Sequence, residues 1–476
     1  MSKTEENAEL PWERGDTGGA AAELRLVIVW SLDDPARVGE SAAVRAPCEL
    51  GRGPAEGAAE RVVFEQQRPG SCTRRPPLDS PRISRRQLVI EPAGADSLRV
   101  RCVGQPGLLV NGEERSEAVV GPGDTLRIRN ALSLWIERRP AALRARPSLA
   151  RWRSFPFGHA DAHGIVGESE RAWLLREQLA SACEARRHVL LLGESGVGKE
   201  LAARALHEEL GGGPLVSRNA ATFPSGLVDA ELFGTARGYP NAGSPERVGL
   251  VAEADGGTLF LDEIGELPEE LQARLLRVMD SGEHQRLGES GVRSADIRLI
   301  GATNRELSRI KHDVLARFTV RVTIPPLDER RADIPLIARA LLEAMAGRNP
   351  PMRARFWQGD APRLDPALVE ALVKRKYTHH ARELEYFLFL AASTSYGNFI
   401  ALGPEVQSEL ESLSDAGSAR GGEALRVEAP DRAAIEDALA ACNGSTSKAA
   451  ARLGLPSRFV LYRLMKRLGV ASEEAS

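Results

Sequence analysis

Short apolar runs separated by turn residues fill the chain between about residues 23 and 138. The runs are Leu24–Trp30, Arg61–Phe64, Gln87–Glu91, Leu98–Cys102, Leu108–Val110, Leu126–Ile128 and Leu132–Ile136. Short runs of this kind, broken by Gly, Pro, Asn and Asp, predict an all-β sandwich. The preceding residues are polar and acidic, so we expect residues 1–22 to be disordered.

The pattern changes in the middle of the chain. Val189–Leu192 is continuously apolar and predicts a buried strand, and residues from Glu200 to Glu209 predict a helix. The segment joining them is Gly193, Glu194, Ser195, Gly196, Val197, Gly198 and Lys199. In such a strand-to-helix turn, backbone N–H groups converge on an anion, and the lysine reaches the outer phosphates of a nucleotide.

A second buried strand, Thr258–Leu261, ends in two carboxylates. We expect Asp262 to hold Mg²⁺, directly or through water, and Glu263 to polarise the attacking water. Glu200 stands where Ser or Thr usually offers a hydroxyl to the metal, so the ion depends on Asp262, water and nucleotide oxygens. These features together predict an α/β P-loop ATPase.

The C-terminal part, from Asp431 to Val470, predicts short helices over Ala434–Ala441, Ser447–Leu453 and Pro456–Leu468. The glycine turn at Gly454 suits a helix-turn-helix that binds DNA. Its candidate contacts to bases and phosphates are Lys448, Ser457, Arg458, Tyr462, Arg463 and Lys466. The alternative is a helical dimerisation bundle with a solvated basic face.

Composition breaks separate these regions. Residues 139–162 are rich in Ala, Arg and Pro, and residues 402–428 in Ser, Gly and acidic residues, so both are predicted linkers. The expected organisation is thus 1–22 disordered, 23–138 β-sandwich, 139–162 linker, 163–401 ATPase, 402–428 linker and 429–472 helix-turn-helix.

The overall composition is that of a protein with apolar cores. Hydrophobic residues make up 42% and charged residues 27%, with a net charge of -3, so any basic DNA-binding face is local. No apolar run is long enough for a membrane helix, and the N-terminus does not resemble a signal peptide. The 5 cysteines are scattered, which argues against a disulfide framework or a metal site. We expect a cytoplasmic protein without a membrane partner.

The central region resembles the AAA+ domain of sigma-54-dependent transcription activators, the bacterial enhancer-binding proteins. Gly164–Ser169 is similar to the family's opening motif, and the resemblance implies that Ile165 and Val166 line the adenine pocket. The phosphate loop also matches, including Glu200 at its last position. The resemblance covers roughly half of the chain, and it implies ATP and Mg²⁺ as cofactors.

The same resemblance assigns further catalytic roles. Asn219 would pair with Glu263 and release it when nucleotide is sensed, and Asn304 resembles sensor I. Arg382 resembles sensor II on the helical lid. Arg317 is the candidate arginine finger, which acts on the nucleotide of a neighbouring subunit and therefore implies a ring. Lys311 stands where the family has a second arginine, which keeps the charge but loses the planar fork.

The loop by which these activators contact sigma-54 is altered in this chain. Glu231–Gly234 keeps the family sequence, but the family's Gly-Ala-Phe-Thr-Gly-Ala motif is replaced by a segment that includes Gly238, Tyr239, Pro240 and Asn241. Proline stiffens the loop, and the aromatic residue has moved by one position. Sigma-54 RNA polymerase is the expected partner, with a regulator that does not engage sigma-54 as the alternative.

Both ends of the chain also resemble known domains. The C-terminal part resembles the Fis-type DNA-binding domain, which implies an upstream activating sequence as the DNA partner. The N-terminal part resembles the forkhead-associated domain, through Leu50–Arg52, Ile83–Gln87, Val110–Gly112 and Gly123–Asp124. That resemblance implies a phosphothreonine-containing protein as partner.

In the forkhead-associated resemblance, Arg52 and Ser84 would contact the phosphate and Asn111 the peptide backbone. Gln87 stands where that family has a structural histidine. The alternatives are a sandwich that has lost its ligand or serves oligomer contacts, with Asn111 in an ordinary hairpin turn.

The sequence therefore predicts an ATP-hydrolysing, DNA-binding transcription regulator gated by phosphothreonine recognition. It would form a homo-oligomeric ring when active and a dimer when inactive. The alternatives are an AAA+ regulator that does not engage sigma-54, and a non-enzymatic phosphoprotein-responsive repressor or adaptor.

Overall fold

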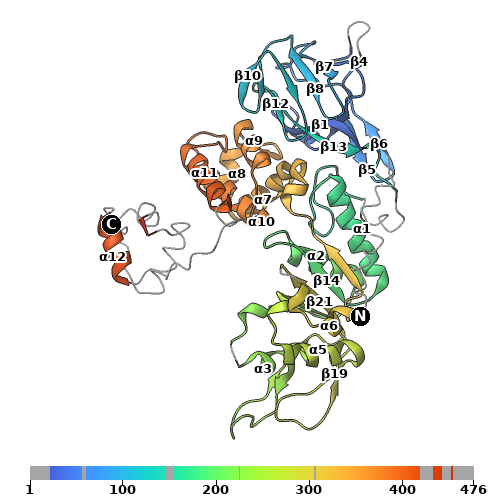
Figure 1. Ribbon diagram of the computed structural model, residues 1–476, viewed down its shortest axis with the longest axis vertical. Helices are drawn as coiled ribbons and strands as arrows, with labels where there is room; N and C mark the ends of the chain where they lie inside the picture. Colours follow the sequence, from blue (N-terminus) through green and yellow to red (C-terminus); the bar gives the residue numbers. More distant parts are fainter. Residues whose placement is uncertain are drawn as a thin grey trace, which may run out of the picture. The chain divides into compact units, whose positions relative to one another are not determined.

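The computed structural model describes residues 22–55, 60–145, 152, 154–224, 226–304, 307–418, 432–441 and 452–453 (Figure 1). Residues Met1–Val406 form one compact unit and residues Gln407–Ser476 a second. The first 21 residues, most of the expected disordered start, lie outside the described residues.

The N-terminal region is built from two β-sheets. The larger sheet has the order β10 (Glu113–Arg115), β9 (Leu108–Val110), β12 (Thr125–Ile128), β13 (Leu132–Pro140), β1 (Ala22–Ser31), β2 (Ser41–Ala43), β5 (Glu65–Arg68) and β6 (Ser71–Arg74). The smaller has the order β11 (Glu117–Val120), β8 (Leu98–Cys102), β7 (Leu88–Pro92), β3 (Cys48–Leu50) and β4 (Glu60–Arg61). A 3-10 turn, η1 (Pro35–Arg37), follows β1.

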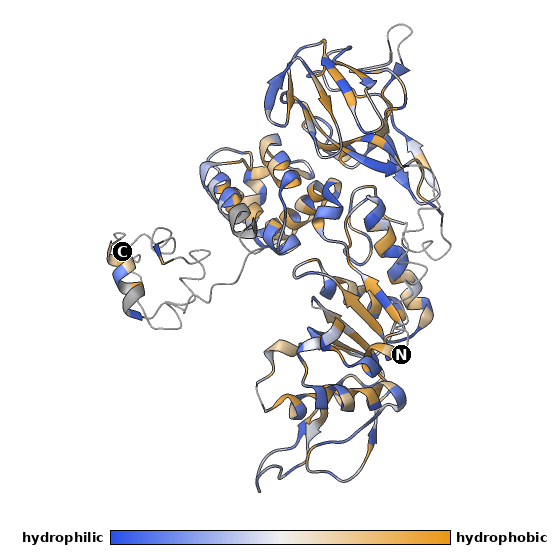
Figure 2. Cartoon of the chain, in the orientation of Figure 1, coloured by the Kyte–Doolittle hydropathy of each residue, from blue (hydrophilic) through white to orange (hydrophobic). Residues whose placement is uncertain are grey.

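The inner faces of these sheets share one apolar core, as an all-β sandwich requires. Leu26 and Ile28 of β1 meet Leu88 and Ile90 of β7 in it, and all four are fully buried. Figure 2 shows the hydrophobic residues concentrated along these strands. The predicted sandwich is therefore confirmed as a fold.

The strand predictions were incomplete. Of the predicted run Arg61–Phe64, only Arg61 is in a strand, while Val62 and Phe64 still enter the core. The strands β2, β3, β5, β6, β10 and β11 were not predicted. Their sequences are short or polar, such as Glu65–Arg68 and Glu113–Arg115, so they lack the apolar runs that the prediction required.

The central region contains a parallel sheet of five strands in the order β15 (Leu215–Asn219), β18 (Thr258–Asp262), β21 (Arg298–Thr303), β14 (Val189–Leu192) and β22 (Val320–Thr323). The helices α1 (Glu170–Ala185) and α2 (Lys199–Leu210) share one apolar core with it. The second core includes α3 (Val228–Phe233), α4 (Leu250–Glu253), α5 (Glu269–Ser281) and α6 (His312–Arg317). Short 3-10 turns are η4 (Ala220–Thr222), η5 (Ile264–Glu266) and η6 (Leu307–Arg309).

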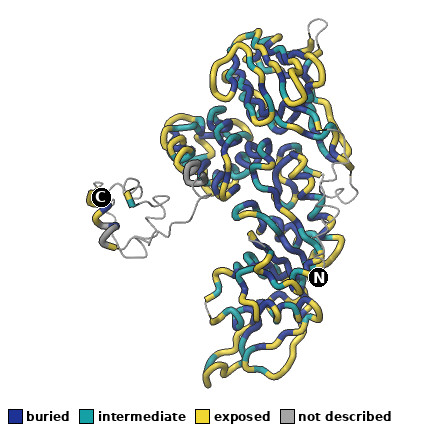
Figure 3. Tube along the Cα trace, viewed as in Figure 1, coloured by how far each residue is buried: buried dark blue, intermediate teal, exposed yellow. Residues whose placement is uncertain are grey.

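Successive residues of β14 point to opposite faces of this sheet. Val189 and Leu191 belong to the core with α1 and α2, whereas Leu190 belongs to the core with α5. Because both faces are covered, the strand is apolar throughout, which is why it was predicted from its composition. Figure 3 shows this buried layer between exposed helix surfaces.

A helical subdomain follows the sheet. It consists of η7 (Leu327–Glu329), η8 (Arg331–Asp333), α7 (Ile334–Arg348), α8 (Pro350–Phe356), α9 (Pro366–Lys374) and α10 (His380–Thr394). The region also contains small two-stranded pairs: β16 (Gly234–Thr235) with β17 (Arg247–Val248), β19 (Glu283–His284) with β20 (Arg293–Ser294), and β23 (Trp357–Gln358) with β24 (Ala361–Pro362).

The predicted linkers contain structured residues. Leu143 and Trp152, within the expected linker 139–162, are buried in the core that contains α1 and α2. The helix α11 (Pro404–Ser418) lies within the expected linker 402–428.

Beyond α11, the described C-terminal helix is α12 (Arg432–Ala441), which matches the first helix predicted there. The other two predicted C-terminal helices lie almost entirely outside the described residues. No helix within the described ranges is both long enough and apolar enough to cross a membrane.

Candidate active site

The phosphate loop connects β14 to α2 through a backbone that depends on glycine. Gly196 and Gly198 have φ angles of 84° and 109°, and Gly198 is the N-cap of α2. A Cβ atom on Gly196 would lie 2.2 Å from the carbonyl oxygen of His379. The loop therefore needs glycine at 196 for its backbone angles and for the close approach of the helical subdomain.

Lys199 is the first residue of α2, and only 7% of it is exposed. Its Nζ donates to the carbonyl oxygens of Gly193 at 3.0 Å and Glu194 at 3.2 Å, and lies 4.0 Å from Oε1 of Glu263. Burial lowers the pKa of Lys199, and the charges of Asp262 and Glu263 partly oppose this shift. The amine is thus held inside the loop, facing the acidic end of β18.

Asp262 and Glu263 lie where β18 ends, as the sequence predicted. Oδ1 of Asp262 accepts from the backbone N–H of Glu263 at 3.0 Å. Oε2 of Glu263 accepts from the backbone N–H of Asn304, at the end of β21, at 3.4 Å. The ends of adjacent parallel strands thus bring the predicted catalytic carboxylate and the predicted sensor I residue together.

The predicted pairing of Asn219 with Glu263 does not occur in this structure. Nδ2 of Asn219 instead lies 3.5 Å from Oδ2 of Asp262, and its Oδ1 caps the next turn by accepting from Ala221 N–H at 2.9 Å. The reason is register, because β15 pairs with β18 so that Asn219 lies opposite Asp262.

The helical subdomain docks on the phosphate loop. Nη1 of Arg382 donates to Oγ of Ser195 at 3.2 Å, and the backbone N–H of Ala381 donates to Gly196 O at 3.1 Å. Arg382 therefore lies at the loop, where the sensor II role requires it.

His380 was not predicted as a site residue. It is 1% exposed, its Nε2 lies 3.2 Å from Oε2 of Glu194, and its Nδ1 accepts from Leu327 N–H at 3.4 Å. Since Nδ1 accepts, Nε2 carries the proton and donates to Glu194. The signal in the sequence was the histidine pair just before Arg382, whose function the local pattern does not reveal.

The opening motif is held by a buried arginine that sequence reasoning also missed. Nη2 of Arg176 donates to Ile165 O at 2.9 Å, and Nη1 donates to Gly167 O at 2.8 Å. Nε of the same side chain pairs with Asp161 at 2.8 Å, and Arg176 is fully buried. Ile165 and Val166 are themselves buried, and Ile165 shares a core with Val197 of the phosphate loop. The candidate adenine-binding residues thus adjoin the loop.

Glu200 does not point its carboxylate into the loop. It forms an ion pair of 3.4 Å with Arg204, and its side chain is 70% exposed. Among the residues described, no group of three or more His, Cys, Asp and Glu side chains is placed to hold a metal. Asp262 as the carboxylate ligand of a Mg²⁺ ion stays a prediction from the sequence, with phosphates and water as the expected other ligands.

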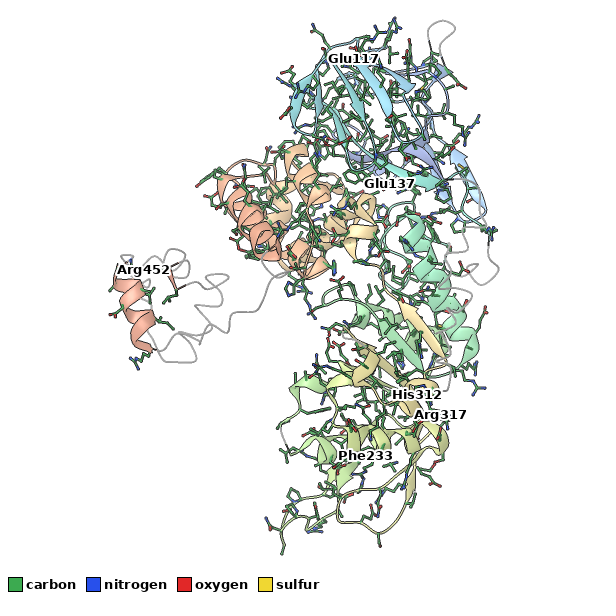
Figure 4. All side chains as sticks on the ribbon, in the orientation of Figure 1. Glu117, Glu137, Phe233, His312, Arg317 and Arg452 are labelled. Carbon is green, nitrogen blue, oxygen red and sulfur yellow. The ribbon has the colours of Figure 1, made fainter. Side chains whose placement is uncertain are left out.

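Arg317 ends α6, just before β22 begins, and so lies beyond the amino edge of the parallel sheet. The phosphate loop lies at the opposite, carboxyl edge. Nη2 of Arg317 donates to Asp280 at 3.1 Å (Figure 4 labels Arg317 and His312 on α6). Lys311 forms a 3.6 Å ion pair with Glu269. From this edge Arg317 cannot serve the nucleotide of its own subunit.

The segment of the altered contact motif connects β16 to β17. Gly238 N–H donates to Ser244 O at 2.8 Å, and Tyr239 N–H donates to Ala236 O at 3.2 Å, so the segment forms tight turns. Tyr239 packs on Gly288, where a Cβ atom would lie 2.7 Å from the Tyr239 side chain. The aromatic residue is thus supported by the loop between β19 and β20.

In the sandwich, Arg52 and Ser84 are adjacent. Arg52 N–H donates to Ser84 O at 3.0 Å, while the Ser84 hydroxyl is engaged with the backbone of Gln105. Gln87 is fully buried and joins the two loops, accepting from Ser84 N–H at 3.0 Å and donating to Pro106 O at 2.7 Å. The glutamine therefore serves as a buried structural bridge.

Asn111 is not joined to Arg52 or Ser84 by any described hydrogen bond. Its Nδ2 donates to Asp124 at 2.8 Å, and its Oδ1 accepts from Thr125 N–H at 3.0 Å and from Lys374 Nζ at 2.6 Å. By contrast, Arg61, which was not predicted as a site residue, lies beside Gly51, the residue before Arg52, because a Cβ on Gly51 would meet the Nη1 of Arg61 at 2.8 Å.

All of the predicted DNA contacts, Lys448, Ser457, Arg458, Tyr462, Arg463 and Lys466, lie outside the described residues. The exposed Arg452, labelled in Figure 4, is described in the same region.

Comparison with known proteins identifies the class. Residues 165–321 match the sigma-54 interaction domain, and residues 427–468 match the Fis family of bacterial regulatory proteins. The chain belongs to the family of sigma-54-dependent transcriptional regulators, in which an AAA+ ATPase module is combined with a DNA-binding helix-turn-helix.

Individual relatives support this assignment. The chain is 39% identical over 343 residues to nitric oxide reductase transcription regulator NorR1 of Cupriavidus necator, covering 66% of this chain and 65% of that protein. It is 35% identical over 314 residues to transcriptional regulatory protein ZraR of Klebsiella oxytoca, covering 64% and 69%. It is 34% identical over 323 residues to formate hydrogenlyase transcriptional activator FhlA of Escherichia coli, and the match covers 64% of this chain and 44% of that protein. The chain thus spans between less than half and about two thirds of the length of these relatives.

Proposed function

We propose that this protein is an ATP-hydrolysing, DNA-binding transcription regulator of the sigma-54 activator type. The observation that carries the proposal is the convergence of Lys199, Asp262, Glu263 and Arg382 on one phosphate loop. A buried amine, two carboxylates and an arginine from the helical subdomain, gathered around a helix N-terminus, suit the terminal phosphates of ATP.

The chemistry assigns a separate task to each group. The loop N–H groups and Lys199 bind the phosphates, and Asp262 holds Mg²⁺, which neutralises phosphate charge when bound. Glu263, anchored by Asn304 N–H, orients the attacking water. Asn219 acts on this carboxylate pair through Asp262, its partner in the structure.

The test is ATP turnover by the full chain at several protein concentrations. We expect Glu263→Gln to lower turnover by about a hundredfold or more while ATP binding persists, because only the water-orienting carboxylate is lost. Glu270→Gln, an exposed glutamate on α5, is the matched control and should match wild type. Wild-type protein that binds ATP without turnover would favour the alternative of a non-enzymatic repressor or adaptor.

We further propose that nucleotide turnover moves the segment containing Gly238, Tyr239, Pro240 and Asn241 against sigma-54 RNA polymerase. The second candidate, which the altered loop sequence leaves open, is a regulator whose loop engages a different partner. Co-elution with sigma-54 in the presence of a transition-state analogue separates the two. Binding that is lost in Tyr239→Ala supports the first candidate, and no co-elution by wild type supports the second.

The remaining partners are proposed from the family and from geometry. The Fis-type segment would bind an upstream activating sequence through Lys448, Ser457, Arg458, Tyr462, Arg463 and Lys466. Arg317, at the sheet edge opposite the phosphate loop, would complete the site of a neighbouring copy, so we propose a ring as the active state and a dimer as the inactive one.

For the N-terminal sandwich we propose recognition of a phosphothreonine-containing protein by Arg52 and Ser84. Support comes from the neighbouring Arg61, whose buried Nε and Nη1 have no hydrogen-bond partner within the described residues. Phosphopeptide affinity should fall in Arg52→Ala and stay unchanged in Arg99→Ala, an exposed arginine on β8. Equal affinity in both variants would remove the proposed site.

A further inference from the structure

The sandwich contacts the helical subdomain through buried polar groups. Nε1 of Trp30, on β1, donates to Leu364 O at 2.8 Å, and Oγ of Ser133, on β13, donates to Oε1 of Glu370 at 3.1 Å. Trp30 is 6% exposed, Ser133 is fully buried and Glu370 is 6% exposed. Because buried polar groups are costly without partners, these contacts fix a specific arrangement.

Glu370, on α9, depends on the sandwich for its partners. Besides Ser133, its carboxylate forms a 3.3 Å ion pair with Arg127 of β12. Burial raises the pKa of Glu370, and the charge of Arg127 opposes that rise. Removal of one partner of a buried ion pair is strongly destabilising, because it leaves the other charge uncompensated. The position of α9 is therefore tied to the sandwich.

The same sandwich reaches the opening motif at a second place. Arg68, on β5, donates to both carboxylate oxygens of Glu168 at 2.5 and 3.1 Å and to Phe155 O at 2.8 Å. Its guanidinium lies 4.3 Å from the ring centre of Phe155. Glu168 is 1% exposed and lies two residues after Val166, a candidate adenine-binding residue. A bidentate buried pair of this kind is strong and directional.

Glu168 and its neighbour also bind the start of the helical subdomain. The backbone N–H groups of Glu168 and Ser169 donate to Oδ1 of Asp333 at 2.8 and 2.9 Å, and the Ser169 hydroxyl donates to Oδ2 at 2.5 Å. Asp333 is 1% exposed and immediately precedes α7. The sandwich, the opening motif and the helical subdomain are thus joined by one continuous set of buried contacts.

We propose that Arg68 and Glu370 are positioning residues for the nucleotide. Through Arg68 the sandwich fixes the position of the opening motif, which lies beside the proposed adenine site. Through Glu370 it fixes the helical subdomain, which places His380 and Arg382 on the phosphate loop. Nucleotide affinity and release therefore depend on the N-terminal sandwich, with or without a phosphopeptide. This inference rests on the proposed ATP site.

The contacts explain how the dependence works. Release of nucleotide requires the helical subdomain to leave the phosphate loop, which breaks the contacts of Arg382 with Ser195 and of His380 with Glu194. While Glu370 is paired with Arg127, that movement must either carry the sandwich or separate a buried ion pair. Weakening the pair lowers the cost of opening.

The test measures binding and release of a fluorescent ADP analogue by the full chain. We expect Arg68→Met and Arg127→Ala each to raise the dissociation rate and the Kd by about fivefold or more, the usual scale of coupling between sites. Arg129→Ala is the matched control, because its ion pair with Glu114 is exposed and on the same sandwich. The control should bind ADP like wild type.

A double-mutant cycle separates positioning from general destabilisation. Arg127→Ala and Glu370→Ala should be non-additive in ADP affinity if they act through their mutual contact. If both Arg68→Met and Arg127→Ala fold cooperatively and release ADP at the wild-type rate, the inference is overturned. If wild type itself binds no ADP, the proposed ATP site fails, and the inference fails with it.

Discussion

The side-chain amine of Lys199 is buried, and burial favours its neutral form over its charged form. Burial lowers the pKa of Lys199, and the nearby carboxylates of Asp262 and Glu263 recover only part of that loss. An incoming triphosphate supplies the negative charge that the protein alone does not provide. At the residue scale, the buried amine of Lys199 therefore favours nucleotide binding, and it lowers the free energy of unfolding of the protein without nucleotide.

We expect Lys199→Met to have a Tm no lower than wild type without nucleotide, and to lose the Tm increase on adding ADP. Since the pKa of folded Lys199 lies below its unfolded value, wild-type stability rises as pH increases through the window between these two values. As the pH becomes alkaline, the Tm of wild type should therefore rise relative to the Tm of the variant. Thermal melts between neutral and alkaline pH measure both effects, and a variant that still responds to ADP would contradict the role of Lys199.

At the scale of the element, the phosphate loop needs glycine for two reasons: a positive φ angle and close packing against the helical subdomain. Gly196 and Gly198 both have positive φ, but only Gly196 lies against another element, the His379 carbonyl at the start of α10. A Cβ on Gly198 would have no other described element within 4 Å. A substitution at Gly198 therefore affects only the backbone conformation of the loop, whereas one at Gly196 also affects docking of the helical subdomain.

We expect Gly196→Ala to lower the free energy of unfolding more than Gly198→Ala. Both variants bear a left-handed backbone cost of about 1 kcal/mol. Only Gly196→Ala adds a clash with His379, which must move the helical subdomain. Denaturant unfolding of both variants measures the difference, and equal losses would mean that the subdomain does not lie on the loop in solution.

At the scale of the whole molecule, the site is divided between the edges of one sheet. The phosphate loop lies at the carboxyl edge, and Arg317 lies beyond the amino edge with Asp280 as its partner. A single copy cannot bring the two together, whereas a second copy placed edge to edge can. Assembly is thus part of the proposed catalysis.

We expect a mixture of Arg317→Ala and Lys199→Ala proteins to recover ATP turnover, although each alone is nearly inactive. In the mixture, an intact phosphate loop of the first variant meets an intact finger of the second. A mixture of Glu263→Gln with Lys199→Ala is the control and should stay inactive, because both defects lie on the phosphate-loop side. Mixed assemblies that form without recovered turnover would remove the finger assignment.

The sequence by itself determined the features that local backbone chemistry produces. The phosphate loop, the acidic end of β18 and the apolar strand β14 depend on nearby residues, so each was predicted at its position. The polar strand β5 carried no such signal, because its pairing with β2 on one side and β6 on the other, rather than its apolar content, makes it a strand.

Only the tertiary structure decided which side chains meet. Strand register places Asn219 opposite Asp262 rather than Glu263. Docking of the helical subdomain brings His380 into contact with Glu194, which lies 186 residues earlier in the chain. The same applies to Glu370, whose partners come from strands more than 200 positions earlier in the chain. Contacts between distant segments depend on how whole elements pack, which residue spacing within one segment does not encode.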